Sequence, residues 1–424
     1  MTRTGNARVT VPGLPARQPS RWRRYAAVFG PGLVVMLADT DVGSVITAGQ
    51  SGAQWGYRLL LLQLLLVPVL YIVQELTVRL GVFTGRGHGE LIRDTFGPFW
   101  AWLSVAGLVI AVLGALVTEM SGVAGVGEIY GVPRWASLLL AVAVLLGTVL
   151  TGSYRRVERV AIALGLFELA FFVVAWWAGP QLGDLARGAA SIPWADKDYA
   201  YLAAANIGAV IMPWMVFYQQ SAVAEKRLGP DHLSAARADT AFGALVTQLV
   251  MAAVLIATAA TLGRAKGGAG LDTVGDLAGA LVPYLGEGAG KLVFALGILG
   301  AGMVASIVVT LALAWGVGEV AGYKRSLELR PRDAGWFYGI YAVGVLGCAL
   351  LVLIWPNLVS LNVGVQIMNA LLLPFVLGFL VALARRALPG TARLRGAYLW
   401  VVTAVVAITT ALGVFGGFSG AGLL

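Results

Sequence analysis

Long apolar runs follow one another through most of this chain, separated by short polar gaps. Hydrophobic residues make up 59% of the 424 residues and charged residues only 12%. Runs of roughly 18 to 25 apolar residues are long enough to cross a bilayer as helices. The sequence therefore predicts an all-α polytopic membrane protein. Eleven spans are predicted, near residues 25–50, 57–83, 99–127, 135–152, 158–178, 200–223, 236–263, 288–317, 334–355, 357–383 and 397–419.

Basic residues are divided unevenly between the two sides of these spans. The formal net charge is +9, with 30 Lys and Arg residues. If the loops alternate between the two sides, 23 of the 30 lie on the side of the N-terminus, and the other side holds only Arg58, Arg134, Arg187, Lys197, Arg264, Lys266 and Lys291. The positive-inside rule then predicts a cytosolic N-terminus and, after eleven spans, an external C-terminus. The expected location is the plasma membrane. Since topology explains the basic charge, no nucleic-acid partner is expected.

The remaining composition limits both the sites and the domains that the chain can form. One Cys and two His residues cannot build a disulfide framework or a Cys- and His-rich zinc site. Residues 1–24 are rich in Pro and Arg and are predicted to be a disordered cytosolic tail. Residues 25–424 are predicted to form a single transmembrane domain, because no polar gap is long enough to bury a core of its own.

Two spans carry features that break a helix. Span one contains "LADTDVGSVITAG", with Asp39 and Asp41 in the middle of an apolar run, and span six contains "NIGAVIMPWM", where Gly208 and Pro213 weaken the helix. Broken helices at corresponding positions of two halves indicate a transporter with inverted repeats and a binding site near the bilayer midplane. The predicted repeats are about 25–178 and 200–383, followed by an extra helix at about 397–419.

An acid in hydrocarbon costs about 2.5 to 3.5 kcal/mol unless it faces a cavity, an ion or a partner. In an unwound segment, Asp41, the hydroxyl of Ser44 and freed backbone carbonyls can form an oxygen-rich cation site. Met212, across the break in span six, adds a thioether, which is a soft ligand suited to transition metals. Together these residue types predict a site for a divalent metal ion.

Structural explanations stay open for each of these residues. Asp39 and Asp41 could cap the second half of span one, and Met212 alone is more typical of core packing. Gln366 and Asn369 in span ten could line the pathway or bond between helices. The i, i+4 spacing of Glu75 and Arg79 predicts a structural ion pair, whereas two further intramembrane acids have no partner evident from the sequence, Glu119 and Asp239.

Three motifs resemble the natural resistance-associated macrophage protein (Nramp) family of divalent metal transporters. In that family the motif Gly-Pro-Gly is followed, after eight intervening residues, by Asp-Pro-Gly-Asn. Here Gly-Pro-Gly occupies residues 30–32, and the same spacing leads to "DVGS" at residues 41–44. "GAVIMPWM" is similar to the family's span six, Gly-Ala-x-x-Met-Pro-His. "QIMNALLLPF" is similar to its span ten. The resemblance covers nearly the whole chain.

Departures from the family pattern resemble the Nramp-related magnesium transporters. The Asp-x-Asp-x-Gly pattern of 39–43, "VQELTVRLGVFTGRG" and "PWMVFYQQSAVAEK" are similar to that branch. Trp214 occupies the position at which proton-coupled members carry His in span six. In span three those members carry an Asp three residues before a Glu. If Glu119 matches this Glu, Leu116 occupies the position of the Asp. The resemblance thus implies transport without proton coupling. Met212, by contrast, is a feature of the transition-metal branch.

The resemblance implies a leucine-transporter-like fold with two inverted five-helix repeats, broken helices 1 and 6, and alternating access. It implies that the ion is surrounded by Asp41, Ser44, the Ala209 carbonyl and Met212, with Gln366 closing the site; secondary candidates are Asp39, Asn369 and Glu119. The expected partners are the bilayer and Mn²⁺, Mg²⁺ or Fe²⁺ as substrate. No resident cofactor and no protein partner are expected.

Two other function classes compete with a metal transporter. An organic-cation or amino-acid carrier could use the same fold, since fold does not fix function, but two adjacent acids would repel a substrate carboxylate. An enzyme is not expected, because the spans contain no Ser, Cys and His constellation for nucleophilic catalysis.

Overall fold

The computed structural model describes residues 28–193, 196–262, 271, 274, 275, 277, 278, 286–354, 362–390 and 392–420. The predicted tail of residues 1–24 lies outside the described residues. Nearly all of the described chain is helical, and it contains no strand. The helices are α2 (Pro31–Asp39), α3 (Val42–Trp55), η1 (Gly56–Leu59), α4 (Leu60–Thr84), α5 (His88–Phe96), α6 (Pro98–Ile129), α7 (Arg134–Val149), α8 (Tyr154–Gly165), η2 (Leu166–Leu169), α9 (Ala170–Trp177), α10 (Leu182–Ala190), α11 (Lys197–Val210), α12 (Pro213–Glu225), η3 (Pro230–His232), α13 (Leu233–Thr261), η4 (Gly286–Gly290), α15 (Lys291–Ala321), α16 (Gly335–Ile354), α17 (Asn362–Arg386) and α18 (Gly396–Gly420).

The predicted polytopic all-α architecture is confirmed. Within the described residues, nine helical segments are long and apolar enough to cross a membrane. One of these segments joins α3 and α4, and α7, with 16 residues, is shorter than any of the nine. The count of eleven spans and the two repeats therefore stay predictions. Two short helices, α5 and α10, occupy gaps in which the sequence predicted no helix.

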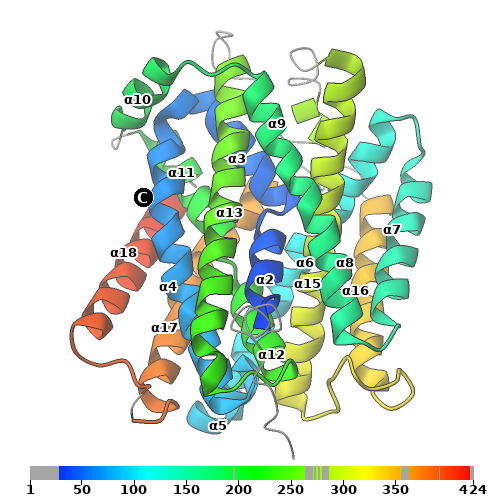
Figure 1. Cartoon of the computed structure of the whole chain (residues 1–424), viewed down its shortest axis with the longest axis vertical. Coiled ribbons are helices and arrows are strands. Elements are labelled where there is room, and N and C mark those ends of the chain that lie inside the picture. Colours follow the sequence, from blue (N-terminus) through cyan, green and yellow to red (C-terminus); the bar gives the residue numbers. More distant parts are fainter. Residues whose placement is uncertain are drawn as a thin grey trace, which may run out of the picture.

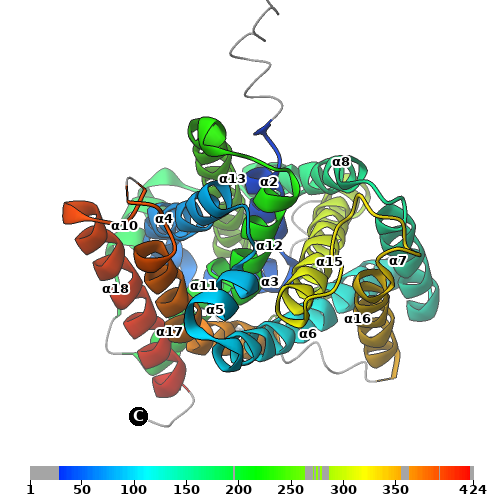
Figure 2. The ribbon, with the colours of Figure 1, turned by 90° about the horizontal axis from the view of Figure 1, so that it is seen from below.

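The broken helices lie in the centre of the molecule and the other helices surround them (Figures 1 and 2). In the most apolar stretch of the α11–α12 segment, 83% of the residues are buried within the protein. In the corresponding stretch of α18, 22% of the residues are buried. Large apolar side chains on the outer helices, such as Leu140 on α7 and Trp400 on α18, are exposed. In a membrane these side chains face lipid, so the polar residues of the central helices are sheltered from it.

The two breaks occur where the sequence predicted them. α2 ends at Asp39 and α3 begins at Val42, with Asp41 as its N-cap residue. α11 ends at Val210 and α12 begins at Pro213, a position where the missing N–H of proline costs nothing.

The expected role of Gly208 in breaking span six is wrong, because Gly208 lies inside α11. A Cβ at this position would lie 1.9 Å from the Gln366 carbonyl oxygen. Gly208 therefore allows α11 to pack closely on α17.

The first turn of α2 is fixed by an acid from another helix. Asp239 of α13 accepts hydrogen bonds from the backbone N–H groups of Gly30 (3.1 Å), Gly32 (2.8 Å) and Leu33 (3.1 Å). The first N–H groups of a helix have no intrahelical partner, and a carboxylate at this end also suits the helix dipole. Asp239, for which the sequence indicated no partner, therefore caps α2 and holds this helix against α13.

We expect Asp239→Ala to lower the free energy of unfolding by about 3 kcal/mol, because buried N–H groups at the start of α2 would lose their acceptor. Thermal melting of the purified protein in detergent measures this loss. Asp333→Ala is the matched control, since Asp333 is exposed and should leave the melting temperature unchanged. Equal melting temperatures for Asp239→Ala and the unmodified protein would contradict the capping role.

Candidate functional site

The two helix breaks meet at a hydrogen bond between residues 165 positions apart. The Ser44 hydroxyl on α3 donates to the Ala209 carbonyl on α11 over 2.9 Å. The Asp41 carboxylate lies at the same place, because its Oδ1 accepts from the Ser44 N–H over 2.6 Å. The structure thus brings together three of the predicted ligands, Asp41, Ser44 and the Ala209 carbonyl.

Asp41 caps α3, which was one of the structural explanations that the sequence left open. A carboxylate has two oxygens and about four lone-pair positions. One N–H bond therefore leaves capacity for an ion, and the cap fixes the direction in which the carboxylate points. Likewise, Ser44 and Ala209 retain lone pairs, although an ion that contacts both would replace or share their mutual hydrogen bond.

The predicted ligands from spans six and ten follow from the same breaks. Met212 comes shortly after Ala209 in the chain, and the Gln366 backbone packs against Gly208. Met212 lies in the break as the N-cap residue of α12, and its side chain belongs to the buried apolar core. Gln366 on α17 accepts a hydrogen bond from the Asn369 amide over 3.0 Å. The second side-chain oxygen of this pair, Asn369 Oδ1, is buried without a hydrogen-bond partner among the described residues.

All five predicted ligands are closed off from solvent. The exposed fraction of Asp41, Ser44, Ala209, Met212 and Gln366 is at most 2% in each case. An ion could therefore enter this region only after some helices move, as an alternating-access protein requires.

The secondary candidates Asp39 and Glu119 differ in their contacts. Glu119 Oε2 accepts from the N–H of Val42 over 3.1 Å, so Glu119 fixes the start of α3 from the side of α6. Val42 itself is enclosed, since a Cβ on Gly122 would lie 2.5 Å from one of its methyl groups. Asp39, by contrast, is buried and neither carboxylate oxygen has a partner in the described chain. It does not cap a helix.

One buried acid near the breaks was not predicted from the sequence. Glu168 lies in η2, a 3₁₀ turn in the middle of span five, and is fully buried. Thr40, at the end of α2, lies beside its carboxyl group. The signal was present in the sequence, because Glu168 interrupts the apolar run "ALGLFELAFFVV" just as Glu119 interrupts span three.

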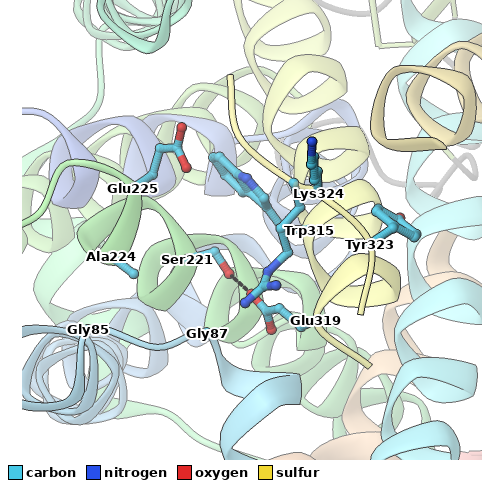
Figure 3. A pocket seen from close by; sticks show the side chains of 10 residues that line it. Gly85, Gly87, Ser221, Ala224, Glu225, Trp315, Glu319, Tyr323 and Lys324 are labelled. Atoms are coloured by element: carbon cyan, nitrogen blue, oxygen red, sulfur yellow. Dashed lines mark hydrogen bonds between the residues drawn. The ribbon is translucent and has the colours of Figure 1, made fainter. Parts of the chain in front are cut away.

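A cavity of about 280 Å³ lies at the end of the molecule where α2 begins. Figure 3 shows that residues of α12 and α15 line it, and that Ser221 and Glu319 close one side by a hydrogen bond of 2.5 Å. Glu319 also accepts from the Gly89 N–H over 2.8 Å. Because α12 has 13 residues, its two ends lie about 20 Å apart. The cavity is therefore well separated from the breaks.

The predicted ion pair of Glu75 and Arg79 is confirmed, with a distance of 2.7 Å. Arg237 of α13 binds the same carboxylate at 2.5 Å. Glu75 is therefore a structural residue that joins α4 to α13.

Comparisons with known proteins agree with this architecture. The family model described as natural resistance-associated macrophage protein-like matches residues 32–419. A divalent metal cation transporter MntH of Brucella suis is 30% identical over 311 residues, which cover 70% of this chain and 67% of that protein. The family and such relatives are transporters, so the prediction of a transporter and not an enzyme is confirmed.

Solved structures show the same fold at low sequence identity. A manganese transporter of Eremococcus coleocola superposes with a TM-score of 0.76 at 20% identity, covering 96% of this chain and 89% of that one. Mhp1, a nucleobase-cation-symport-1 family transporter in a closed conformation, gives a TM-score of 0.58 at 13% identity, covering 96% and 93%. The leucine-transporter-like fold is thereby confirmed. The match of the family model over almost the whole described chain, together with the Brucella suis relative, shows that this integral multi-pass membrane protein belongs to the Nramp family.

Proposed function

We propose that this protein transports divalent metal cations across the plasma membrane by alternating access, with Mn²⁺ preferred and Mg²⁺ bound more weakly. The observation that carries the proposal is the position of Asp41. Its carboxylate lies at the meeting point of two broken helices, beside the Ser44 hydroxyl and the Ala209 carbonyl. Asp41, Ser44, the Ala209 carbonyl, Met212 and Gln366 form the proposed ion site.

The chemistry of these ligands supports a divalent ion of intermediate softness. Carboxylate, hydroxyl and carbonyl oxygens suit both Mg²⁺ and Mn²⁺, whereas the Met212 thioether favours Mn²⁺. The Brucella suis relative is named a divalent metal cation transporter and the Eremococcus coleocola protein a manganese transporter, which supports the same class of substrate. The similarity of several motifs to the magnesium branch supports some capacity for Mg²⁺.

An amino-acid or organic-cation carrier is the alternative on this fold. Such carriers present helix N-termini and backbone groups to the carboxylate of their substrate. Here Asp39 and Asp41 lie next to the break and are both buried. Their charges oppose a substrate carboxylate and favour a small cation, so the alternative is disfavoured.

We also propose that metal transport runs without proton coupling. Leu116 and Trp214 are buried and cannot carry a proton at the positions where proton-coupled members have Asp and His. Neither histidine of the chain replaces the missing imidazole. His88 lies in α5, outside the membrane-spanning helices, where burial lowers its pKa to about 4. It is therefore neutral at physiological pH. His232 lies in the exposed turn η3.

The orientation of the protein is part of the proposal. The excess of Lys and Arg on the N-terminal side favours a cytosolic N-terminus and an external C-terminus. The cavity bounded by Ser221 and Glu319 then lies at the cytosolic end, and the contacts of these residues close that end in this conformation.

Asp41→Ala should abolish Mn²⁺ binding and uptake while the protein remains folded, because the ion would lose its anionic ligand. Calorimetry and uptake into liposomes measure the two effects. Asp231→Ala, in the exposed turn η3, is the matched control and should behave like the unmodified protein. Normal Mn²⁺ uptake by Asp41→Ala would refute the proposed site.

Mn²⁺ uptake into liposomes should cause no acidification of the lumen. A pH-reporting dye inside the liposomes measures this, with valinomycin and equal K⁺ on both sides to hold the membrane potential at zero. The expected result follows from the lack of a titratable side chain at Leu116 and Trp214. A proton influx in fixed proportion to the metal influx would show that another acid carries protons.

Met212→Ala should weaken Mn²⁺ binding by about 1 to 2 kcal/mol, or roughly 5- to 30-fold, and leave Mg²⁺ binding nearly unchanged. Binding calorimetry with each ion gives the two affinities. Met215→Ala is the matched control, since Met215 is also buried in α12 but lies past the break. If Met212→Ala weakens the binding of both ions equally, Met212 is a packing residue, and the site is better interpreted as one of the magnesium-transporter type.

A further inference from the structure

Glu168 has no assigned role, yet its position is costly. It lies near the middle of span five, is fully buried, and neither of its carboxylate oxygens has a well-formed hydrogen bond among the described residues. The helix narrows to a 3₁₀ turn at this point, from Leu166 to Leu169. Such a turn inside a helix often marks a functional position. An intramembrane acid of this kind calls for a partner.

Glu168 lies against α15 and near the end of α2. A Cβ on Gly300 of α15 would lie 3.5 Å from the Glu168 backbone nitrogen. α8 lies against α2 just before Glu168, because a Cβ on Gly165 would lie 2.7 Å from the Leu37 side chain. Figures 1 and 2 both place α2 between α13 and α8.

One turn beyond Gly165, the Glu168 carboxyl lies beside the Thr40 hydroxyl and within electrostatic reach of Asp39 and Asp41. Glu119 of α6 is within electrostatic reach of Glu168 as well. Two buried carboxylates from different spans therefore approach each other here.

The Asp39 carboxylate is also unsatisfied. It is 1% exposed and both of its oxygens lack a partner in the described chain. Among the ion pairs of the described residues, none involves Asp39 or Glu168. The C-terminal end of α2 adds the negative end of a helix dipole to the same place. A cation bound between these two acids would compensate both carboxylates and the end of the helix.

The contacts of Thr40 bring further oxygen atoms to this place. Thr40 Oγ1 lies 3.2 Å from Thr247 Oγ1, and Thr247 donates a hydrogen bond to the Met36 carbonyl. The Leu37 carbonyl accepts from the Thr40 N–H over 3.1 Å, and the carbonyls after it are the last ones of α2, which have no intrahelical donor. No thioether, thiol or imidazole is found among these groups, in contrast to the Met212 side of the transport site. Oxygen ligands of this kind select hard cations.

We propose that Asp39, Thr40 and Glu168 form a second cation site, separate from the Asp41 site, that binds Na⁺. A monovalent ion is favoured because a second divalent ion this close to the first would meet strong repulsion in a medium of low dielectric constant. The Na⁺ would neutralise one of the two carboxylate charges and tie the end of α2 to η2. The choice of a monovalent ion rests on the proposed binding of a divalent ion at Asp41, whereas the existence of the second site does not.

Direct binding of radioactive Na⁺ to the purified full-length protein tests the proposal, with choline replacing Na⁺ at constant ionic strength. We expect saturable binding of one Na⁺ per chain, competed poorly by K⁺, and a melting temperature that rises with Na⁺ concentration. Glu168→Gln should weaken Na⁺ binding at least about tenfold. If that variant does not fold, Asp39→Asn should give the same loss.

The Asp41→Ala variant separates this proposal from the proposed function. It should retain Na⁺ binding while it loses Mn²⁺ binding, whereas Glu168→Gln should lose Na⁺ binding and retain Mn²⁺ binding. Absence of Na⁺ binding by the unmodified protein between pH 6 and 8 would overturn the proposal, and protons would then be the counter-charge of these acids. Unchanged Na⁺ binding by Glu168→Gln and Asp39→Asn would overturn it as well.

Discussion

The structure depends on how a broken helix satisfies its free backbone groups where no water is available. In hydrocarbon, each unpaired N–H or carbonyl costs several kcal/mol, so a break must be enclosed by protein. Here carboxylates supply the acceptors. Asp41 caps the start of α3 by accepting from the Ser44 N–H, and Glu119 accepts from the N–H of Val42. The acids that the break requires for its stability also create the negative potential that attracts a cation.

The same arrangement joins the two broken helices. The hydrogen bond from Ser44 to the Ala209 carbonyl crosses from α3 to α11. Gly208, one residue earlier, lets α11 approach the Gln366 carbonyl on α17. Helices from three parts of the chain therefore meet within one turn of the proposed ligands. Movement of α2 or α17 would alter the proposed site directly, and this is how alternating access can couple ion binding to a change of conformation.

Sequence alone located the breaks but not what they contact. Two acids in an apolar run and a proline preceded by Met212 indicated both breaks, because these residues conflict with a continuous membrane helix. The contact of Ser44 with Ala209, and the true role of Gly208, depend on packing between helices that no local pattern encodes. Asp239 could not be recognised as a cap, since its partners are backbone groups more than 200 positions away. Glu168 was visible as an acid in an apolar span, but its proximity to Thr40 was not.

The central claim is that a divalent metal ion binds between the two helix breaks. Anomalous diffraction from crystals soaked in Mn²⁺ tests it most directly. The account predicts one strong anomalous peak in contact with the Asp41 carboxylate, the Ala209 carbonyl and the Met212 sulfur. A strong peak elsewhere, for instance between Asp39 and Glu168, with no density beside Asp41, would contradict it.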